Sequence, residues 1–220
     1  DKNTTKFSIS ISGADRTLKL ENECDPIDYS SLDADGHIVS PIFHEISNDV
    51  FKKIKDDSNF LLVDPQGFLR QKDSKNNIIL KKTDLDLSDV TAIKINPEEG
   101  QNIVSGSHDE MMLALQKKGI EYVLLTNKSN VSLLVKNRVY SLKLPNKNIH
   151  DTTGIGDIFC SAFTCTMLKE KDFLWALCFA AGSAQAALES NNVGLQKIPK
   201  KGMVENNASY FYNLVDFRDL

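Results

Sequence analysis

Residues 151–157 read DTTGIGD and stand directly before a run of small and apolar residues. Gly154 and Gly156 give the backbone freedom, and a helix is predicted to begin directly afterwards, so several N–H groups would converge at a positive helix end. This pattern predicts an anion hole. Asp157 would be an ionised, weak base there, which suffices for phosphoryl transfer because the proton leaves late in a loose transition state. The alternative is that Asp157 only caps the helix and the glycines form a tight turn.

Several other classes of function are excluded by motif and composition. The glycine pair lacks the third glycine of a dinucleotide-binding motif, since Phe159 stands there, and no Gly-Lys-Ser/Thr run of a P-loop occurs. A net charge of -4, with cations dispersed among acids, argues against a nucleic-acid surface, and no apolar run reaches membrane-spanning length. Four cysteines without CxxC pairing favour a reducing, cytoplasmic compartment.

The elements that must position the glycine loop alternate between strand and helix. Short apolar runs at residues 59–65, 91–96 and 121–126 predict buried strands, and the last of these follows a helix that begins at a Ser107–Glu110 capping box and stops at Gly119. Further helices are expected at residues 45–57, 157–169, 172–189 and 200–214, with a hairpin around residues 136–138. This order predicts an α/β fold with a mainly parallel sheet and helices on both faces.

The first residues have a different pattern. Phe7, Ile9 and Ile11 alternate with serines ahead of a Gly13-containing turn, which indicates a half-buried β-hairpin over residues 7–20. We therefore expect residues 1–24 to form a β-lid hairpin and residues 25–220 to form an α/β nucleotide-binding core. A lid of this kind could close over a substrate or pair with a second lid in a homodimer.

Several motifs, which occur in the same order along the chain as in a known family, resemble the motifs of that family. The stretch DTTGIGDIFCSAF is similar to the C-terminal signature of the ribokinase-like, or PfkB-type, carbohydrate kinases, usually D-T-T-G-A-G-D followed by a small-residue helix. NPEE at residues 96–99 resembles the N-x-x-E motif of that family, VDPQGFLR at residues 63–70 resembles its D-x-N/Q-x-x-x-R stretch, and Thr126 follows a strand as in its T-x-G-x-x-G motif. TTKF resembles its lid strands, and the order agrees over residues 4–199.

The resemblance implies a ribokinase-like fold with a small β lid and an ATP-dependent kinase that phosphorylates a hydroxyl of a sugar, polyol or nucleoside. From the charge and the lack of a long apolar run we expect no nucleic-acid or membrane partner. Asp157 would be the general base. The resemblance implies that catalysis uses Asp157 with the backbone of Gly154, Ile155 and Gly156. It implies that the nucleotide is bound by Asn96, Thr126, Thr153, Gly154 and Gly156.

The resemblance also implies metal ions. Asn96 and Glu99 would be aimed at a hydrated Mg²⁺ on the nucleotide phosphates, and the alternative is a Pro-containing turn that caps the next element. Asp151 and Thr153 would contribute to the monovalent-cation site of some family members, and the alternative is hydrogen bonding within the loop. The segment from Asp64 to Arg70 would border the phosphate site, although a surface turn explains it equally well.

The sequence departs from the family pattern at three places. Ile155 replaces a small residue, and Lys128 and Val131 occupy the places of the two glycines in the T-x-G-x-x-G motif, which puts nucleotide choice in question. The chain begins at Asp1 and has no counterpart of the N-terminal βαβ region with its Gly-Gly substrate motif, so we expect it to be part of a longer protein. These departures keep a second hypothesis open, a non-catalytic nucleotide- or metabolite-binding relative.

Overall fold

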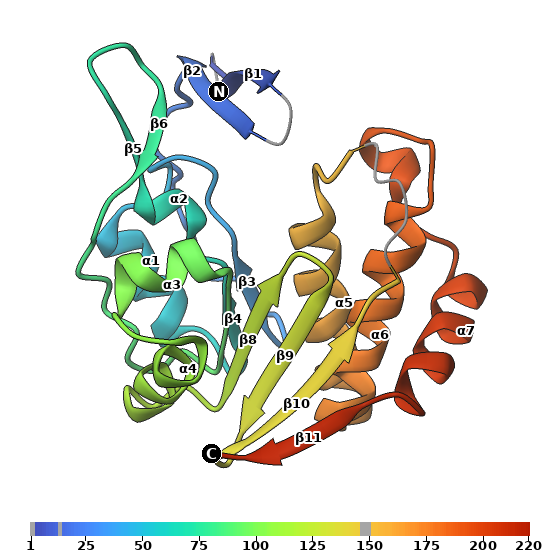
Figure 1. Ribbon diagram of the computed structural model, residues 1–220. Coiled ribbons are helices and arrows are strands. Elements are labelled where there is room, and N and C mark those ends of the chain that lie inside the picture. The colour runs from blue at the N-terminus through green and yellow to red at the C-terminus, as the bar shows by residue number, and fades with distance from the viewer. Residues whose placement is uncertain (1–2, 13–14, 146–150) are drawn as a thin grey trace.

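The computed structural model describes residues 3–12, 15–145 and 151–220. Within these residues a seven-stranded mixed sheet has the strand order β11-β10-β9-β8-β7-β4-β3 (Figure 1). Strands β3, β4, β7 and β8 pair in parallel, and β9, β10 and β11 extend the sheet by antiparallel pairs. Their bounds are β3 His37–Val39, β4 Leu61–Val63, β7 Ala92–Ile95, β8 Tyr122–Asn127, β9 Asn130–Val135, β10 Arg138–Lys143 and β11 Asp216–Asp219.

The central strands are short apolar runs because both faces of the sheet are covered. All three residues of β4 are buried, with Leu62 in one core cluster and Leu61 and Val63 in the other. The same alternation holds on β8, where Leu124 faces one core and Val123 and Leu125 face the opposite one. Parallel strands buried on both sides carry such continuous hydrophobic sequences.

Two layers of helices cover the sheet (Figure 1). Their bounds are α1 Asn48–Asp56, α2 Gln66–Leu69, α3 Pro97–Ile103 and α4 His108–Lys117 in one layer, and α5 Ile155–Glu170, α6 Phe173–Leu188 and α7 Lys201–Tyr212 in the other. The alanine-rich α6 is buried along most of its length, as its sequence predicts. No helix within the described residues is both long and apolar enough to cross a membrane.

Local capping explains where several helices begin. Ser47 accepts a hydrogen bond from the Val50 N–H, so α1 begins at Asn48 and not at residue 45. The predicted Ser107–Glu110 capping box is confirmed, and both of its reciprocal hydrogen bonds are present. The sequence interpretation missed β3, α2, α3 and β11, which are all short, and the 3-10 helix η1 at Gly194–Lys197.

The predicted hairpin is confirmed as β1 (Lys6–Ser12) paired antiparallel with β2 (Asp15–Asn22). A second hairpin, which the sequence interpretation missed, consists of β5 (Arg70–Lys72) and β6 (Ile78–Leu80). The two hairpins touch, since the Leu20 N–H donates to the Asn76 carbonyl over 2.8 Å, and they lie together above α2 (Figure 1). The β1–β2 hairpin is therefore attached to the segment that follows α2, and its role as a lid stays a prediction.

Helices α6 and α7 cross closely at Gly182. A Cβ added there would lie 2.9 Å from both the Ala208 nitrogen and the Val204 oxygen, closer than backbone atoms permit. We predict that Gly182→Ala lowers the free energy of unfolding by about 1–3 kcal/mol, because the helices must move apart. Gly202→Ala is the matched control, since that added Cβ meets nothing within 4 Å and should stabilise α7 by up to about 1 kcal/mol. Urea denaturation measures both, and equal behaviour of the two variants would contradict this packing.

Candidate active site

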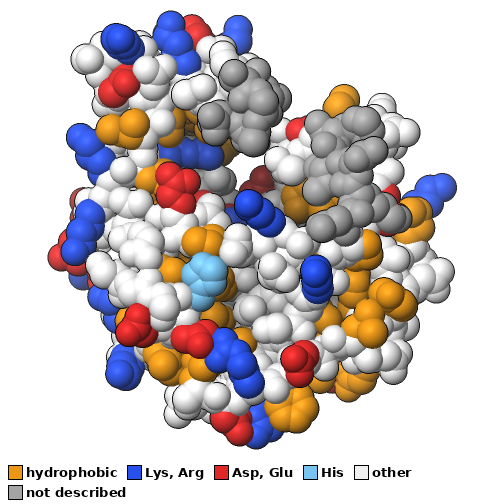
Figure 2. Space-filling model, in the orientation of Figure 1, with side chains coloured by type: hydrophobic (Ala, Val, Ile, Leu, Met, Phe, Trp, Pro, Cys, Tyr) orange, Lys and Arg blue, Asp and Glu red, His pale blue; other side chains and the backbone are white. Residues whose placement is uncertain are grey.

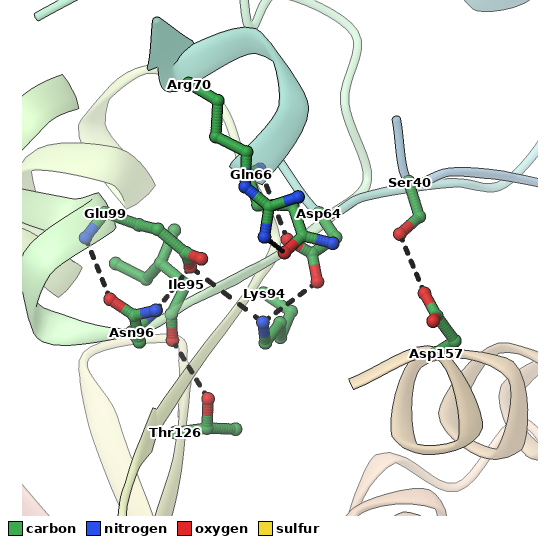
Figure 3. Close-up of polar contacts among 10 residues, drawn as sticks. All are labelled: Ser40, Asp64, Gln66, Arg70, Lys94, Ile95, Asn96, Glu99, Thr126 and Asp157. Atoms are coloured by element: carbon green, nitrogen blue, oxygen red, sulfur yellow. Dashed lines mark hydrogen bonds and ion pairs between the residues drawn. The ribbon is translucent and has the colours of Figure 1, made fainter. Parts of the chain in front are cut away.

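Residues predicted from the sequence lie where the parallel strands end and α5 begins, together with Ser40, which sequence reasoning missed. Ser40 follows β3, Asp64 follows β4 and Asn96 follows β7, and the close-up shows them around one region with Asp157 at the first turn of α5 (Figure 3). The carboxyl ends of parallel strands are the usual ligand-binding edge of an α/β sheet. Figure 2 shows the surface hollowed between the part that carries the lid and the part that carries α5, with side chains of both charges nearby.

The glycine loop leads directly into α5. Gly154 is the N-cap residue and has a φ of 77°, in the left-handed region that favours glycine, and it supplies no side chain to the helix N–H groups. Asp157 is the third residue of the helix and is exposed. Its Oδ1 accepts a hydrogen bond from the Ser40 hydroxyl over 3.0 Å, which orients the carboxylate. The base proposed from the sequence therefore stands at a positive helix end with a fixed orientation.

Gly156 brings the same loop against a buried ion pair. A Cβ added to Gly156 would lie 3.6 Å from both Asp64 Oδ2 and Lys94 Nζ. Those two atoms are themselves 2.9 Å apart, and Lys94 and Asp64 are 8% and 1% exposed. The start of α5 thus rests on charges supplied by β7 and by the end of β4.

Sequence reasoning missed Lys94. Its ammonium also lies 3.9 Å from Glu99 Oε2, and burial alone would lower the pKa of Lys94, but the charges of Asp64 and Glu99 outweigh that effect and raise it. Burial raises the pKa of the Glu99 carboxyl, and the nearby Lys94 charge opposes that rise. The available signal was a lysine inside the apolar strand AIKI, because a buried cation requires an anionic partner.

Asn96 and Glu99 form a capping box at the start of α3. Asn96 Oδ1 accepts from the Glu99 N–H and Glu99 Oε2 accepts from the Asn96 N–H, each over 2.8 Å. The turn that caps the next element, one of the two sequence hypotheses, is therefore present. The same two residues also line a cavity of about 610 Å³, so the cap leaves their metal-binding role as a proposal.

Across that cavity lies the segment that resembles the D-x-N/Q-x-x-x-R stretch. Gln66 and Arg70 line it together with Glu98, and the Arg70 guanidinium donates to Gln66 Oε1 over 2.9 Å. Arg70 also donates to the Ile42 carbonyl over 2.9 Å. Residues of the VDPQGFLR and NPEE segments therefore line one polar cavity together with Leu18 of the predicted lid hairpin. Figure 3 shows the side chains of Gln66, Arg70, Asn96 and Glu99.

The nucleotide loop predicted after β8 is a tight turn into β9. Thr126 donates from Oγ1 to the Ile95 carbonyl over 3.4 Å, which ties the loop to β7. Lys128 has a φ of 52°, in the left-handed region that favours glycine. Val131, at the place of the second glycine, is buried in the core that α5 to α7 cover.

Asp151 and Thr153 hydrogen-bond within the loop, as the alternative proposed. The Thr153 N–H donates to Asp151 Oδ1 over 2.9 Å. In addition, the Lys197 ammonium reaches Asp151 Oδ2 and the backbone carbonyls of both residues, a contact that sequence reasoning missed. Hydrogen bonds from Thr153 and then the Lys197 ammonium lower the pKa of Asp151 to about 2, so its carboxylate is ionised at neutral pH.

Comparison with known proteins now identifies the class. A family model described as pfkB family carbohydrate kinase matches residues 17–201, so the chain belongs to this family and is a carbohydrate kinase. A comparison with curated protein sequences gives no match.

Solved structures agree with this fold. A pyrophosphate-dependent kinase in the ribokinase family, in a sulfate complex, has a TM-score of 0.78 at 19% identity, over 92% of this chain and 74% of its own. Ribokinase from Thermotoga maritima has a TM-score of 0.72 at 15% identity, over 94% and 70%. Arabidopsis thaliana ribokinase complexed with ribose and ATP has a TM-score of 0.57 at 20% identity, over 78% and 55%. The ribokinase-like α/β fold predicted from the sequence is confirmed.

The buried ion pair yields a stability prediction. Lys94→Met should lower the free energy of unfolding by about 3–5 kcal/mol, because it leaves the Asp64 carboxylate buried without its cation. The double variant Lys94→Met with Asp64→Asn should lose less than the sum of the two single variants, since the uncompensated charge is removed. Urea denaturation of the four proteins completes the cycle. Additive losses would show that the two side chains do not interact.

Proposed function

We propose that the protein transfers a phosphoryl group from ATP to a hydroxyl of a sugar, polyol or nucleoside, with Asp157 as general base. One observation carries the proposal. The oriented carboxylate of Asp157 and the backbone N–H groups of residues 154–157 belong to the same four-residue helix start. A base and an anion hole in this arrangement can act on the attacking and the transferring group at the same time.

Asp157 accepts the proton of the acceptor hydroxyl as the oxygen attacks. Its exposure allows a substrate to approach, and the hydrogen bond from Ser40 holds one carboxylate oxygen so that the other can face the hydroxyl. A carboxylate is adequate as the base because the proton leaves late in this reaction. Positioning, more than basicity, is what this residue supplies.

The backbone of Gly154, Ile155, Gly156 and Asp157 stabilises the negative charge that spreads over the transferring group. The Ile155 N–H also donates to the Thr152 carbonyl over 3.3 Å, so the proposed anion hole relies mainly on the N–H groups of Gly154, Gly156 and Asp157. The helix dipole adds to their effect. Lys94 lies directly behind Gly156, where its ion pair with Asp64 supports the loop from below. These groups are in place before any ligand binds, so little reorganisation is required during transfer.

Asn96 and Glu99 would hold a hydrated Mg²⁺ on the donor phosphates. Amide and carboxylate oxygens at the strand end fit an ion that takes its remaining ligands from phosphates and water, and Glu98 faces the same cavity. When bound, the ion would neutralise charge on the phosphates. Thr126, which donates to the Ile95 carbonyl beside Asn96, and Thr153, which directly precedes Gly154, are proposed to contact the nucleotide.

The acceptor is inferred from structures of similar fold, since the groove of about 810 Å³ beside Asp157 is lined mostly by apolar side chains and by Thr153 and Gly154, which are assigned to the nucleotide. Among kinases of similar fold, one structure is complexed with a pyrophosphate analog and myo-inositol, and another with ribose and ATP. We infer an acceptor of this size and chemistry for this chain.

Replacement of the base tests the mechanism. Asp157→Asn should lower kcat by about 10²–10⁴-fold, because the amide cannot accept the proton. Nucleotide binding, measured by calorimetry, should persist. Asp172→Asn is a matched control, since Asp172 caps α6 at a similar helix end and asparagine caps equally well. The assay screens sugars, polyols and nucleosides with Mg²⁺, and unchanged turnover in Asp157→Asn would eliminate the proposed base.

The turn at Lys128 tests where the donor binds. Lys128→Gly should lower KM for ATP with little change in kcat, because loss of the side chain lets the nucleotide approach the backbone. Lys136→Gly is the matched control, because Lys136 also has a positive φ, of 47°, in a β-turn outside the proposed nucleotide site. The same assays are run with pyrophosphate as donor. An equal KM for ATP in both variants would show that this loop does not contact the nucleotide. Turnover with pyrophosphate but not with ATP would show that pyrophosphate is the donor.

A further inference from the structure

The ammonium group of Lys197 is surrounded by oxygen atoms of the residues that directly precede Gly154. Lys197 is the last residue of η1, and it is 3% exposed. Its Nζ lies 2.7 Å from the Asp151 carbonyl oxygen, 3.1 Å from Asp151 Oδ2 and 3.2 Å from the Thr153 carbonyl oxygen. Two backbone carbonyls and one carboxylate thus surround a buried cation.

These oxygens form the kind of site that a monovalent metal ion occupies. Backbone carbonyls can replace the hydration shell of such an ion, and a carboxylate balances its charge. An ammonium is a compact cation with three N–H donors, and three acceptor oxygens are within hydrogen-bond distance of it. Lys197 and Asp151 also balance each other in charge, so a second cation would gain no net attraction there.

We propose that Lys197 is a built-in replacement for the monovalent cation that the sequence predicted at Asp151 and Thr153, and that it positions the catalytic loop without any bound alkali metal ion. The oxygens expected to coordinate an ion are already bound to the ammonium. The residues present therefore do not fit an additional ion. Lys197 is a positioning residue, because it acts on the loop and not on the reacting atoms.

The geometry explains how it positions the loop. In a trans peptide the carbonyl of one residue and the N–H of the next point in opposite directions. A Thr153 carbonyl held toward Lys197 therefore directs the Gly154 N–H away from the ammonium, toward the anion-hole side of the loop. The Asp151 carboxylate adds a second restraint, since its other oxygen accepts the Thr153 N–H. Residues 151–153 are thus fixed from two sides.

Thermal unfolding tests the proposal without reference to activity. The wild-type protein should have the same Tm in potassium, sodium and tetramethylammonium chloride at equal ionic strength. Lys197→Met keeps an apolar stem and removes the cation, so its Tm should fall and should rise again with potassium or ammonium chloride but not with tetramethylammonium, which is too large for the site. A potassium-specific rise in the wild-type Tm would overturn the proposal. So would a Lys197→Met variant that shows no cation-specific rise, and should that variant not fold, the wild-type series decides.

Turnover provides the second measurement, and only this one rests on the proposed function. Lys197→Met should lose roughly 10²-fold in kcat, because a small displacement of the loop misplaces the reacting groups. Potassium or ammonium ions should restore part of that loss, and the wild type should be indifferent to the choice of cation. Lys169→Met is the matched control, since Lys169 is exposed, pairs only with Glu170 among the described contacts and lies near the far end of α5. Loss without rescue would overturn the proposal, whereas an absence of turnover in the wild type would count against the proposed function alone.

Discussion

Lys94 lies on a central strand of the sheet, and its ammonium is buried between the carboxylates of Asp64 and Glu99. A charge in this position is stable only while both the strand order and the adjacent turns are kept, because each partner comes from a different element. The same contact sets the position of α5, since Gly156 stands directly over the ion pair. The pairing of β4 with β7, the turn into α3 and the start of α5 are therefore coupled through one cation.

Two lysines thus hold the glycine loop from different directions. Lys94 lies beneath Gly156, and Lys197 binds the carbonyls of the residues that precede Gly154. Both are paired with aspartates, so neither adds a free charge to the site, and Asp157 remains exposed between them for chemistry. An anion hole needs N–H groups that are fixed before the substrate arrives, and buried ion pairs supply that rigidity at a point where glycines make the backbone flexible.

The sequence predicts the elements that neighbouring residues specify. It misses the elements that form only through contacts between residues far apart in the sequence. The capping box at Ser107, the alternating hairpin and the apolar strands are specified by neighbouring residues, and all are confirmed. Strand β3 has only three residues and becomes a strand by pairing with β4, which no local pattern reveals. The partners of Lys94 and Lys197 are hidden for the same reason, since their aspartates lie 30 and 46 residues away in the sequence. Lys94 itself carried a local signal, a lysine within the apolar strand AIKI.

Asn96 and Glu99 show how one pattern can serve both stability and chemistry. N-x-x-E is a capping box as well as a family motif, and the structure uses one oxygen of each side chain for the cap. A capping box fixes the rotamers of both residues, because each side chain is bound to the other residue's backbone. A carboxylate fixed in this way faces the cavity with a defined orientation, which is what a ligand to a hydrated ion requires. The cap therefore supports the proposed metal-binding role and does not compete with it, provided that the ion takes the remaining oxygen lone pairs.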